Sequence, residues 1–166
     1  WWKDFRSMDP TDILISIRKI VRSVNLESKR IDKQMGVSIP QLLCLDFLNR
    51  QPQYKASAKE IKEFLQLNAS TVTGIIQRLE QKGFIAKLPK AEDRRVTLIT
   101  LTSKGADVLQ NRPSLLQDKL AAKLDSLPES EVEAVAKAIE LITNLMEVHD
   151  LDASPVLTSE TQLNKE

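Results

Sequence analysis

Near the start of the chain, apolar residues recur at steps of three and four, the spacing of one face of an α-helix. The positions that share this face are Ile13, Ile17, Ile20, Val24 and Ile31. Thr11 or Asp12 can cap the start of the helix, and Gly36 can end it in the left-handed conformation that glycine adopts without strain. The pattern therefore predicts one long helix over residues 11–35.

Three shorter helices are predicted next, each introduced by a residue that can cap it. Ser38 with Gln41, and Ser57 with Glu60, have the spacing of a capping box, in which each residue's side chain satisfies the other's backbone N–H. Asn68 can cap the third of these helices. The apolar positions of the three helices are, in order, Leu42, Leu45 and Leu48, then Ile61, Phe64 and Leu65, then Val72, Ile76 and Leu79.

The last two of these helices are joined by three or four residues, which is the spacing of a helix-turn-helix. The second of the pair ends at Gly83, and its non-core faces carry hydroxyl, amide and guanidinium groups on Ser70, Thr71, Thr73, Gln77 and Arg78. Short polar side chains let a helix approach base edges in the major groove, where Gln and Arg can hydrogen-bond to them. We interpret this helix as a DNA-reading helix, with an ordinary solvated face as the alternative.

From Ile85 onward the helical period is lost, and β-branched residues accumulate after Arg95. Two short strands, 85–88 and 95–101, around a polar turn predict a β-hairpin. A hairpin directly after a helix-turn-helix is a wing. Residues 51–55, which precede the helix-turn-helix, are predicted to be a polar loop.

Helical spacing returns after the wing. Thr102 can cap another helix, which Pro113 should kink or break. Ser126 and Glu129 have the spacing of a third capping box, ahead of a last helix whose apolar stripe runs to Met146. Residues 150–166 have little apolar pattern and are predicted to form a mobile tail. Residues 1–7 precede a natural start at Met8 and are interpreted as added or upstream sequence.

Composition limits the classes of function. The 166 residues, 42% of them apolar, suffice for one ordinary domain with a core. Their apolar runs are too short for a transmembrane helix, and no secretory pattern precedes Met8, so we expect a cytoplasmic protein without a membrane partner. One cysteine, one histidine and four glycines argue against a disulfide framework, a multi-histidine metal site and a Gly-rich phosphate loop.

The lone cysteine and the lone histidine also argue against catalysis. Cys44 lies among leucines, where a buried inert thiol is favoured over a redox sensor. A nucleophilic triad would have to use His149, near the end of the last helix. We therefore expect no enzyme, no metal and no cofactor.

The formal net charge of +1 conceals a strong asymmetry. Residues 1–52 carry nine basic and six acidic residues, and residues 53–104 carry ten and five. Residues 105–166 carry five basic and twelve acidic residues. The basic middle contains the predicted reading helix and wing, which suits a polyanionic partner, although chance clustering on solvated helices is the alternative.

Two stretches resemble the MarR-type transcriptional regulators. Asp93-Arg94-Arg95, followed by Leu101-Thr102 and Gly105, is similar to that family's wing signature. Ser70-Thr71-Val72-Thr73, continuing through Leu79-Glu80-Gln81-Lys82-Gly83-Phe84-Ile85, is similar to its recognition helix and exit. The first helix, in Ile17–Arg22 and Leu26–Arg30, also looks similar to the branch that regulates compatible-solute (osmostress) genes.

The resemblance implies a mainly helical winged helix-turn-helix protein that binds a pseudo-palindromic double-stranded DNA operator as a homodimeric repressor. It places the DNA-binding lobe at 38–102 and the dimerisation helices at 11–35 and 103–149. Arg95 would enter the minor groove, Asp93 would orient an arginine, and Arg94 would contact the minor groove or a phosphate. The full set of expected DNA contacts is Ser70, Thr71, Thr73, Gln77, Arg78, Lys90, Asp93, Arg94 and Arg95.

The family resemblance also implies a small-molecule effector of unspecified identity. The competing hypothesis is a winged-helix module that binds proteins rather than DNA, and the basic middle segment with Arg94 and Arg95 argues against it.

Overall fold

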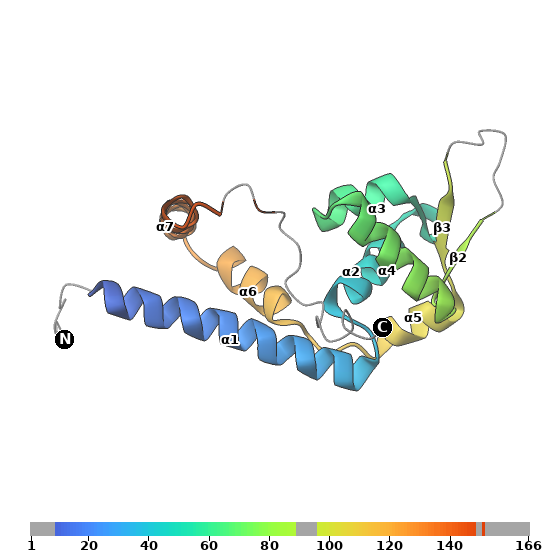
Figure 1. The fold of residues 1–166 in the computed structure, drawn as a ribbon, viewed down its shortest axis with the longest axis horizontal. Coiled ribbons are helices and arrows are strands. Elements are labelled where there is room, and N and C mark those ends of the chain that lie inside the picture. The colour runs from blue at the N-terminus through green and yellow to red at the C-terminus, as the bar shows by residue number, and fades with distance from the viewer. Residues whose placement is uncertain (1–8, 89–95, 149–150, 152–166) are drawn as a thin grey trace, which may run out of the picture.

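The computed structural model describes residues 9–88, 96–148 and 151. Helices dominate these residues, with one small antiparallel sheet between them (Figure 1), as the sequence predicts. The elements are α1 (Pro10–Met35), α2 (Ile39–Arg50), a single 3-10 turn (Pro52–Tyr54), β1 (Lys55–Ser57), α3 (Ala58–Leu65), α4 (Ala69–Gln81), β2 (Ile85–Lys87), β3 (Leu98–Leu101), α5 (Ser103–Gln110), α6 (Leu116–Asp125) and α7 (Glu129–Leu145).

Most of the predicted helix starts are confirmed by their caps. Ser38 and Gln41 form a capping box at α2, and Ser57 and Glu60 form one at α3. Asn68 and Thr102 cap α4 and α5 through their side chains. These caps satisfy backbone N–H groups that a helix leaves without partners in its first turn, so they fix where each helix begins.

Two predicted caps are wrong. α1 begins at Pro10, and the Asp9 side chain accepts from the Thr11 N–H, so the cap lies before Thr11 and Asp12. Proline in the first turn favours this earlier start because its missing N–H costs no hydrogen bond there. The predicted box at Ser126 does not form, because Ser126 ends α6 and donates to the Lys123 carbonyl, while Pro128 immediately precedes α7.

The sheet has three antiparallel strands in the order β1-β3-β2. β2 and β3 are the arms of the predicted wing, and Ile85 pairs with Leu101. β1 was not predicted: it begins at Lys55, the last residue of the predicted polar loop, and its Ala56 pairs with Ile99. Only Ala56 of its three residues is buried, so β1 has almost no hydrophobic signature and arises from pairing with β3.

The described core consists of two apolar clusters. The lobe core lies between α2, α3, α4 and the sheet and includes Leu45, Leu48, Ile61, Ile75 and Leu79. The junction cluster lies where α1 meets α2 and the segment before α6. Its buried members are Ile31, Val37, Ile39, Leu42 and Leu115.

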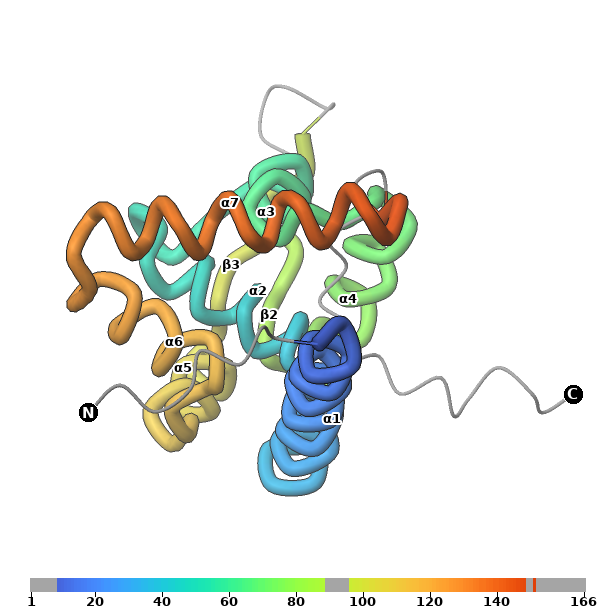
Figure 2. Tube along the Cα trace, turned by 90° about the vertical axis from the view of Figure 1, so that its left-hand side faces the viewer, coloured from blue at the N-terminus to red at the C-terminus, as the bar shows by residue number. Residues whose placement is uncertain are grey.

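The remaining helices differ in how many side chains they contribute to these clusters. α5 contributes Val108 and Leu109 to both clusters, and the break at Pro113 separates it from α6 as predicted. α7 and the first half of α1 extend away from the lobe (Figure 1), and Figure 2 shows α7 running across the direction of α1. No residue of α7 is buried in the described structure. No helix formed by the described residues is long and apolar enough to span a bilayer.

Candidate nucleic-acid interface

α4 has one buried face and one open face. Val72, Ile75, Ile76 and Leu79 point into the lobe core, which confirms the predicted core side of this helix. Ser70, Thr73, Gln77 and Arg78 are exposed, and Thr71 is half-buried at the edge. The structure thus brings the five predicted reading residues together on the solvent side of one helix. Their contact with DNA remains a prediction.

The hydroxyl groups on this face are already held by hydrogen bonds to the first turn. Ser70 Oγ donates to Asn68 Oδ1 at 2.7 Å, and the Thr71 N–H donates to the same oxygen at 2.8 Å. Thr73 Oγ1 donates to the Ala69 carbonyl at 2.8 Å. Each hydroxyl oxygen still has acceptor capacity and stays close to the backbone. The side chains at the start of α4 are therefore short and ordered, and this end of the helix can approach another surface closely.

Gly74 is a feature of this face that sequence reasoning missed. It follows Ser70 by four residues and precedes Arg78 by four, so helical geometry aligns the three on one side. Apart from the neighbouring residues and the backbone of α4 itself, no described atom lies within 4 Å of a methyl group placed on Gly74. The middle of the exposed face is therefore bare backbone, and the i, i+4 spacing was the signal that could have found it.

The base of the wing is joined to α4. The Leu88 N–H donates to the Leu98 carbonyl at 2.9 Å, which extends the pairing of β2 and β3 by one step. Lys87 Nζ on β2 lies 2.6 Å from Glu80 Oε2 on α4. The hairpin arms and α4 are thus held together at this point. The predicted wing-tip contacts at Lys90, Asp93, Arg94 and Arg95 lie outside the described residues.

The exit of α4 is held by the start of α5. Gly83 is left-handed, with φ of 73°, and its carbonyl accepts from Thr102 Oγ1 at 2.7 Å. Lys104 Nζ donates to the Lys82 carbonyl at 2.8 Å and lies 5.2 Å from the centroid of the Phe84 ring. Gly105 allows α5 to touch this segment, because a methyl group there would overlap the Phe84 carbonyl oxygen. The Leu101-Thr102 and Gly105 signature thus has a packing role.

Cys44 is fully buried in the lobe core. Burial raises the pKa of its thiol from 9.0 to about 12, because a thiolate would be stripped of water there. The predicted burial of Cys44 is thus confirmed, and a thiol that is neutral at physiological pH supports the expectation of low reactivity, which stays a prediction. Within the described residues, no group of three or more His, Cys, Asp and Glu side chains is arranged to hold a metal ion.

A helix pair with a three- to four-residue turn, an exposed polar face on its second helix and a following β-hairpin together define a winged helix-turn-helix. A model of the MarR family matches residues 37–97, from just before α2 to the residue before β3. The HTH-type transcriptional repressor MdtR of Bacillus subtilis (strain 168) is 32% identical over 126 residues, which cover 74% of this chain and 77% of MdtR. The chain belongs to the MarR family.

Two further comparisons extend beyond the lobe. The HTH-type transcriptional regulator YfiV of Bacillus subtilis (strain 168) is 26% identical over 141 residues, covering 85% of this chain and 87% of YfiV. The S. aureus MepR chain in its crystal structure with DNA shares the fold, with a TM-score of 0.61 and 21% identity. That match covers 79% of this chain and 96% of MepR, so the likeness includes helices outside the lobe.

Proposed function

We propose that this protein is a homodimeric transcriptional regulator that binds double-stranded DNA and represses the genes it controls. The observation that carries the proposal is the two-sided α4, whose buried face anchors it to the lobe core while Ser70, Thr73, Gln77 and Arg78 are exposed on the other side. A helix held this way can enter the major groove and hydrogen-bond to base edges. The S. aureus MepR structure, solved with DNA, supports the proposal at the level of the fold.

The charge distribution supports a polyanionic partner. Residues 53–104 carry ten basic residues against five acidic ones, and this segment includes α4 and the wing. The acidic residues gather after position 104. Basic residues that neutralise phosphates release counterions, so binding should weaken steeply as salt rises. Arg95, Arg94 and Lys90 add charge at the predicted wing tip, and Asp93 is proposed to orient an arginine there.

The exposed apolar faces of α1 and α7 support a homodimer. α7 leaves Val135, Ile139 and Leu145 exposed, and α1 leaves Ile20 and Val21 exposed. Large apolar side chains exposed at several positions of one helix are typical of an interaction site. The two helices also complement each other in charge, since α1 carries six basic and three acidic residues and α7 carries four acidic residues and one lysine. A second copy can therefore cover both faces, which is the reason to propose 11–35 and 103–149 as the dimerisation region.

A dimer places two α4 helices on one side, and we expect them to occupy successive major grooves of a pseudo-palindrome with half-sites about ten base pairs apart. Repression would follow from occupying the operator, and the name of MdtR as a repressor supports this direction. A small-molecule effector and target genes in osmostress or compatible-solute synthesis remain predictions from the resemblance. Nothing in the proposed function requires an enzymatic step.

The test is selection of duplexes from a random double-stranded library by the full chain, followed by fluorescence anisotropy over a range of KCl concentrations. We expect an inverted-repeat duplex to be enriched, bound tighter than a scrambled duplex and released by salt. No enrichment over scrambled DNA, or binding that ignores salt, would contradict the proposal and favour the protein-binding module.

Two variants, one of them with a matched control, test the DNA contact and the dimer separately. Arg95→Ala should weaken binding sharply and leave the dimer intact, whereas Arg50→Ala, which removes the same charge from the end of α2, should bind normally. Ile139→Glu should yield a folded monomer by analytical ultracentrifugation and lose the preference for inverted repeats. A dimeric Ile139→Glu variant would refute the dimerisation surface.

A further inference from the structure

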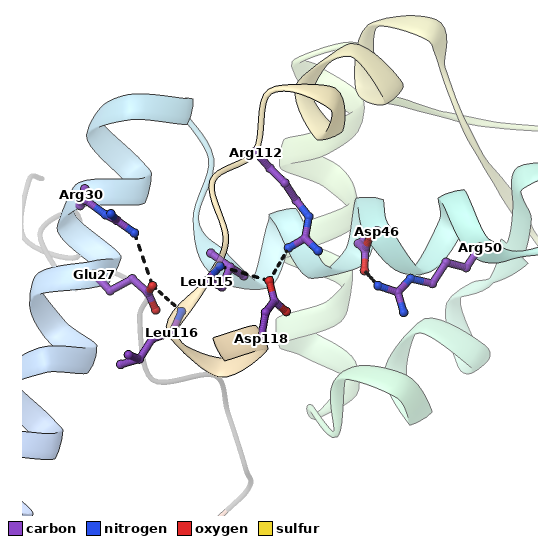
Figure 3. A network of polar contacts seen from close by, with 8 residues as sticks. All are labelled: Glu27, Arg30, Asp46, Arg50, Arg112, Leu115, Leu116 and Asp118. Carbon is purple, nitrogen blue, oxygen red and sulfur yellow. Dashed lines mark hydrogen bonds and ion pairs between the residues drawn. The ribbon is translucent and has the colours of Figure 1, made fainter. Parts of the chain in front are cut away.

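α1 caps the start of α6 from a distant point in the sequence (Figure 3). The Leu116 N–H at the first turn of α6 donates to Glu27 Oε1 at 2.6 Å. Glu27 lies in the second half of α1, its side chain is only 13% exposed, and Arg30 Nη2 lies 3.5 Å from the same oxygen. A carboxylate at a helix N-terminus satisfies an unpaired N–H and is favoured by the helix dipole. Glu27 therefore connects α1 directly to α6.

The segment between α5 and α6 is anchored at two further points near this contact. Asp118 Oδ2 accepts from the Leu115 N–H at 3.1 Å and from Arg112 Nη1 at 3.0 Å (Figure 3). The Leu115 side chain is fully buried among Ile31, Val37 and Leu42 in the junction cluster. α6 and α7 have no buried residue of their own within the described structure. Their orientation to the lobe thus depends on this junction.

The C-terminal end of α1 contacts the end of α4. Lys82, which follows the last residue of α4, donates from Nζ to the carbonyl of Gly36, the residue that ends α1. A cation at a helix C-terminus satisfies an otherwise unpaired carbonyl and is favoured there by the dipole. The stretch from Glu27 to Gly36 therefore touches α6 at one end and α4 at the other.

We propose that Glu27 and Lys82 are positioning residues that together fix the orientation of the reading helix α4 relative to α6 and α7. This inference rests on the proposed function, because it becomes a statement about operator choice only if α6 and α7 hold a second copy. In that dimer, the distance between the two α4 helices depends on the contacts of Glu27 with α6 and of Lys82 with Gly36 in each copy. We call these two contacts the linkage. Its integrity then determines which half-site spacing the protein accepts.

The linkage can be tested without DNA. Nitroxide labels are attached at Thr73→Cys on α4 and Lys123→Cys on α6, and labelled chain is mixed with excess unlabelled chain so that pulsed EPR reports the distance within one protomer. Glu27→Ala and Lys82→Met should broaden or shift the distance distribution. Glu27→Gln and Lys82→Arg keep the acceptor and the donor and should restore it. Wild-type distributions in both Glu27→Ala and Lys82→Met would overturn the proposal.

Matched controls separate the linkage from a general loss of charge. Glu63→Gln removes a carboxylate from the exposed side of α3, and Lys33→Met removes an exposed lysine from the last turn of α1. Both should keep the wild-type distance distribution. Glu27→Asp retains the charge, but its side chain is shorter by one methylene. It replaces Glu27→Ala in the test if circular dichroism shows Glu27→Ala to be unfolded.

Operator choice provides the second measurement. Unlabelled wild-type chain should prefer its selected duplex over duplexes whose half-sites are moved by one base pair. Glu27→Ala and Lys82→Met should bind the selected duplex about fivefold more weakly and lose much of this preference. If Lys82 only contacted a phosphate, Lys82→Met would lower the slope of log affinity against log salt by about one and keep the spacing preference, which would overturn its assignment.

The two measurements fail independently. If the wild-type chain selects no duplex, the proposed DNA-binding function is wrong, while the label distances still decide whether Glu27 and Lys82 hold α4 against α6. If a duplex is selected but both variants retain the wild-type spacing preference, the positioning role is wrong and the DNA-binding function stands.

Discussion

Lys87 Nζ on β2 donates to Glu80 Oε2 on α4 at 2.6 Å, which ties the reading helix to the strand that leads into the wing. Both side chains are partly exposed, Lys87 at 45% and Glu80 at 37%. Ion pairs in such positions contribute little to stability because water and salt screen them. Glu80 is also an acidic group on a lobe with a basic surplus, so its negative charge should weaken the attraction of the lobe to the polyanion that it is proposed to bind.

Glu80→Gln should therefore alter DNA binding more than folding. We expect the free energy of unfolding to change by less than about 1 kcal/mol. Affinity for DNA should rise by about twofold to fivefold at low salt, and the gain should vanish at high salt where the charge is screened. Glu140→Gln on α7 removes the same charge from a distant helix, and an equal gain in that control would show that net charge alone is responsible.

The sequence predicts α4 and its two faces well because the signals there are local. Val72, Ile76 and Leu79 follow the helical period, and Asn68 caps the helix within one turn. β1 escapes prediction because its formation depends on a partner strand more than forty residues away, and Lys55 pairs there with Thr100.

The contacts that join the elements escape prediction for the same reason. Leu116 and Glu27 are 89 residues apart in sequence, and Lys82 and Gly36 are 46 apart. Neither pair follows a helical or strand period, so the sequence alone does not associate them. The false capping box at Ser126 shows the opposite error, since a correct local spacing failed where Ser126 ends α6 and Pro128 immediately precedes α7.

Gly105 should tolerate no side chain. A methyl group there would overlap the Phe84 carbonyl oxygen and lie 2.8 Å from Leu101 Cδ1, so α5 would have to move off the end of α4. Gly105→Ala should lower the free energy of unfolding by about 2 kcal/mol, in the range of overpacked cores. Gly74→Ala is the control, since it adds a methyl group to open space and should stabilise α4 by about 0.5–1 kcal/mol. Urea denaturation measures both, and a neutral Gly105→Ala would contradict the close packing.

Gly74→Ala should also separate stability from binding. Gly74 lies on the same exposed face as Ser70 and Arg78, so the added methyl group would lie between α4 and the DNA. We expect the more stable variant to bind the selected duplex more weakly. Equal or tighter binding would show that the backbone at Gly74 does not approach the groove.

Cys44 should make the protein less stable at high pH. Burial raises the pKa of the folded thiol from 9.0 to about 12, so between these values the unfolded chain releases a proton that the folded chain keeps. The thiol's contribution is fully present below pH 9.0 and is lost as pH rises towards about 12, at about 1 kcal/mol per pH unit.

Comparison with Cys44→Ala isolates this effect, because the two proteins differ only at this side chain. The variant should be less stable at neutral pH, where it lacks a core side chain, and the difference should shrink as pH rises above 9.0. In the folded wild type, iodoacetamide should modify the thiol far more slowly than in the unfolded chain. A constant stability difference across this pH range would contradict the raised pKa.

Ser57 should control both the start of α3 and the acidity of Glu60. The Ser57 N–H and hydroxyl both donate to Glu60 Oε2 at 2.7 Å, and these bonds lower the pKa of Glu60, the backbone bond first. The capping contribution is thus present at neutral pH and is lost as pH falls through the lowered pKa of Glu60. Ser57→Ala should cost about 1 kcal/mol at pH 7 and move the Glu60 pKa upward in an NMR titration. Ser103→Ala, just inside α5, is the control and should leave the Glu60 pKa unchanged.

Gln77 should contribute to the choice of DNA sequence rather than to overall affinity. It is exposed on the face of α4 opposite Leu79, and its neutral amide can pair with a base edge through one donor and one acceptor. Gln77→Ala should reduce discrimination at one base-pair position by about 1–3 kcal/mol and leave binding to scrambled DNA and the salt slope unchanged. Gln117→Ala on α6 removes the same group far from α4 and should bind as the wild type does. If Gln77→Ala lowers affinity equally for every duplex, Gln77 contacts the backbone, and base reading passes to Arg78 and the hydroxyl groups of Ser70 and Thr73.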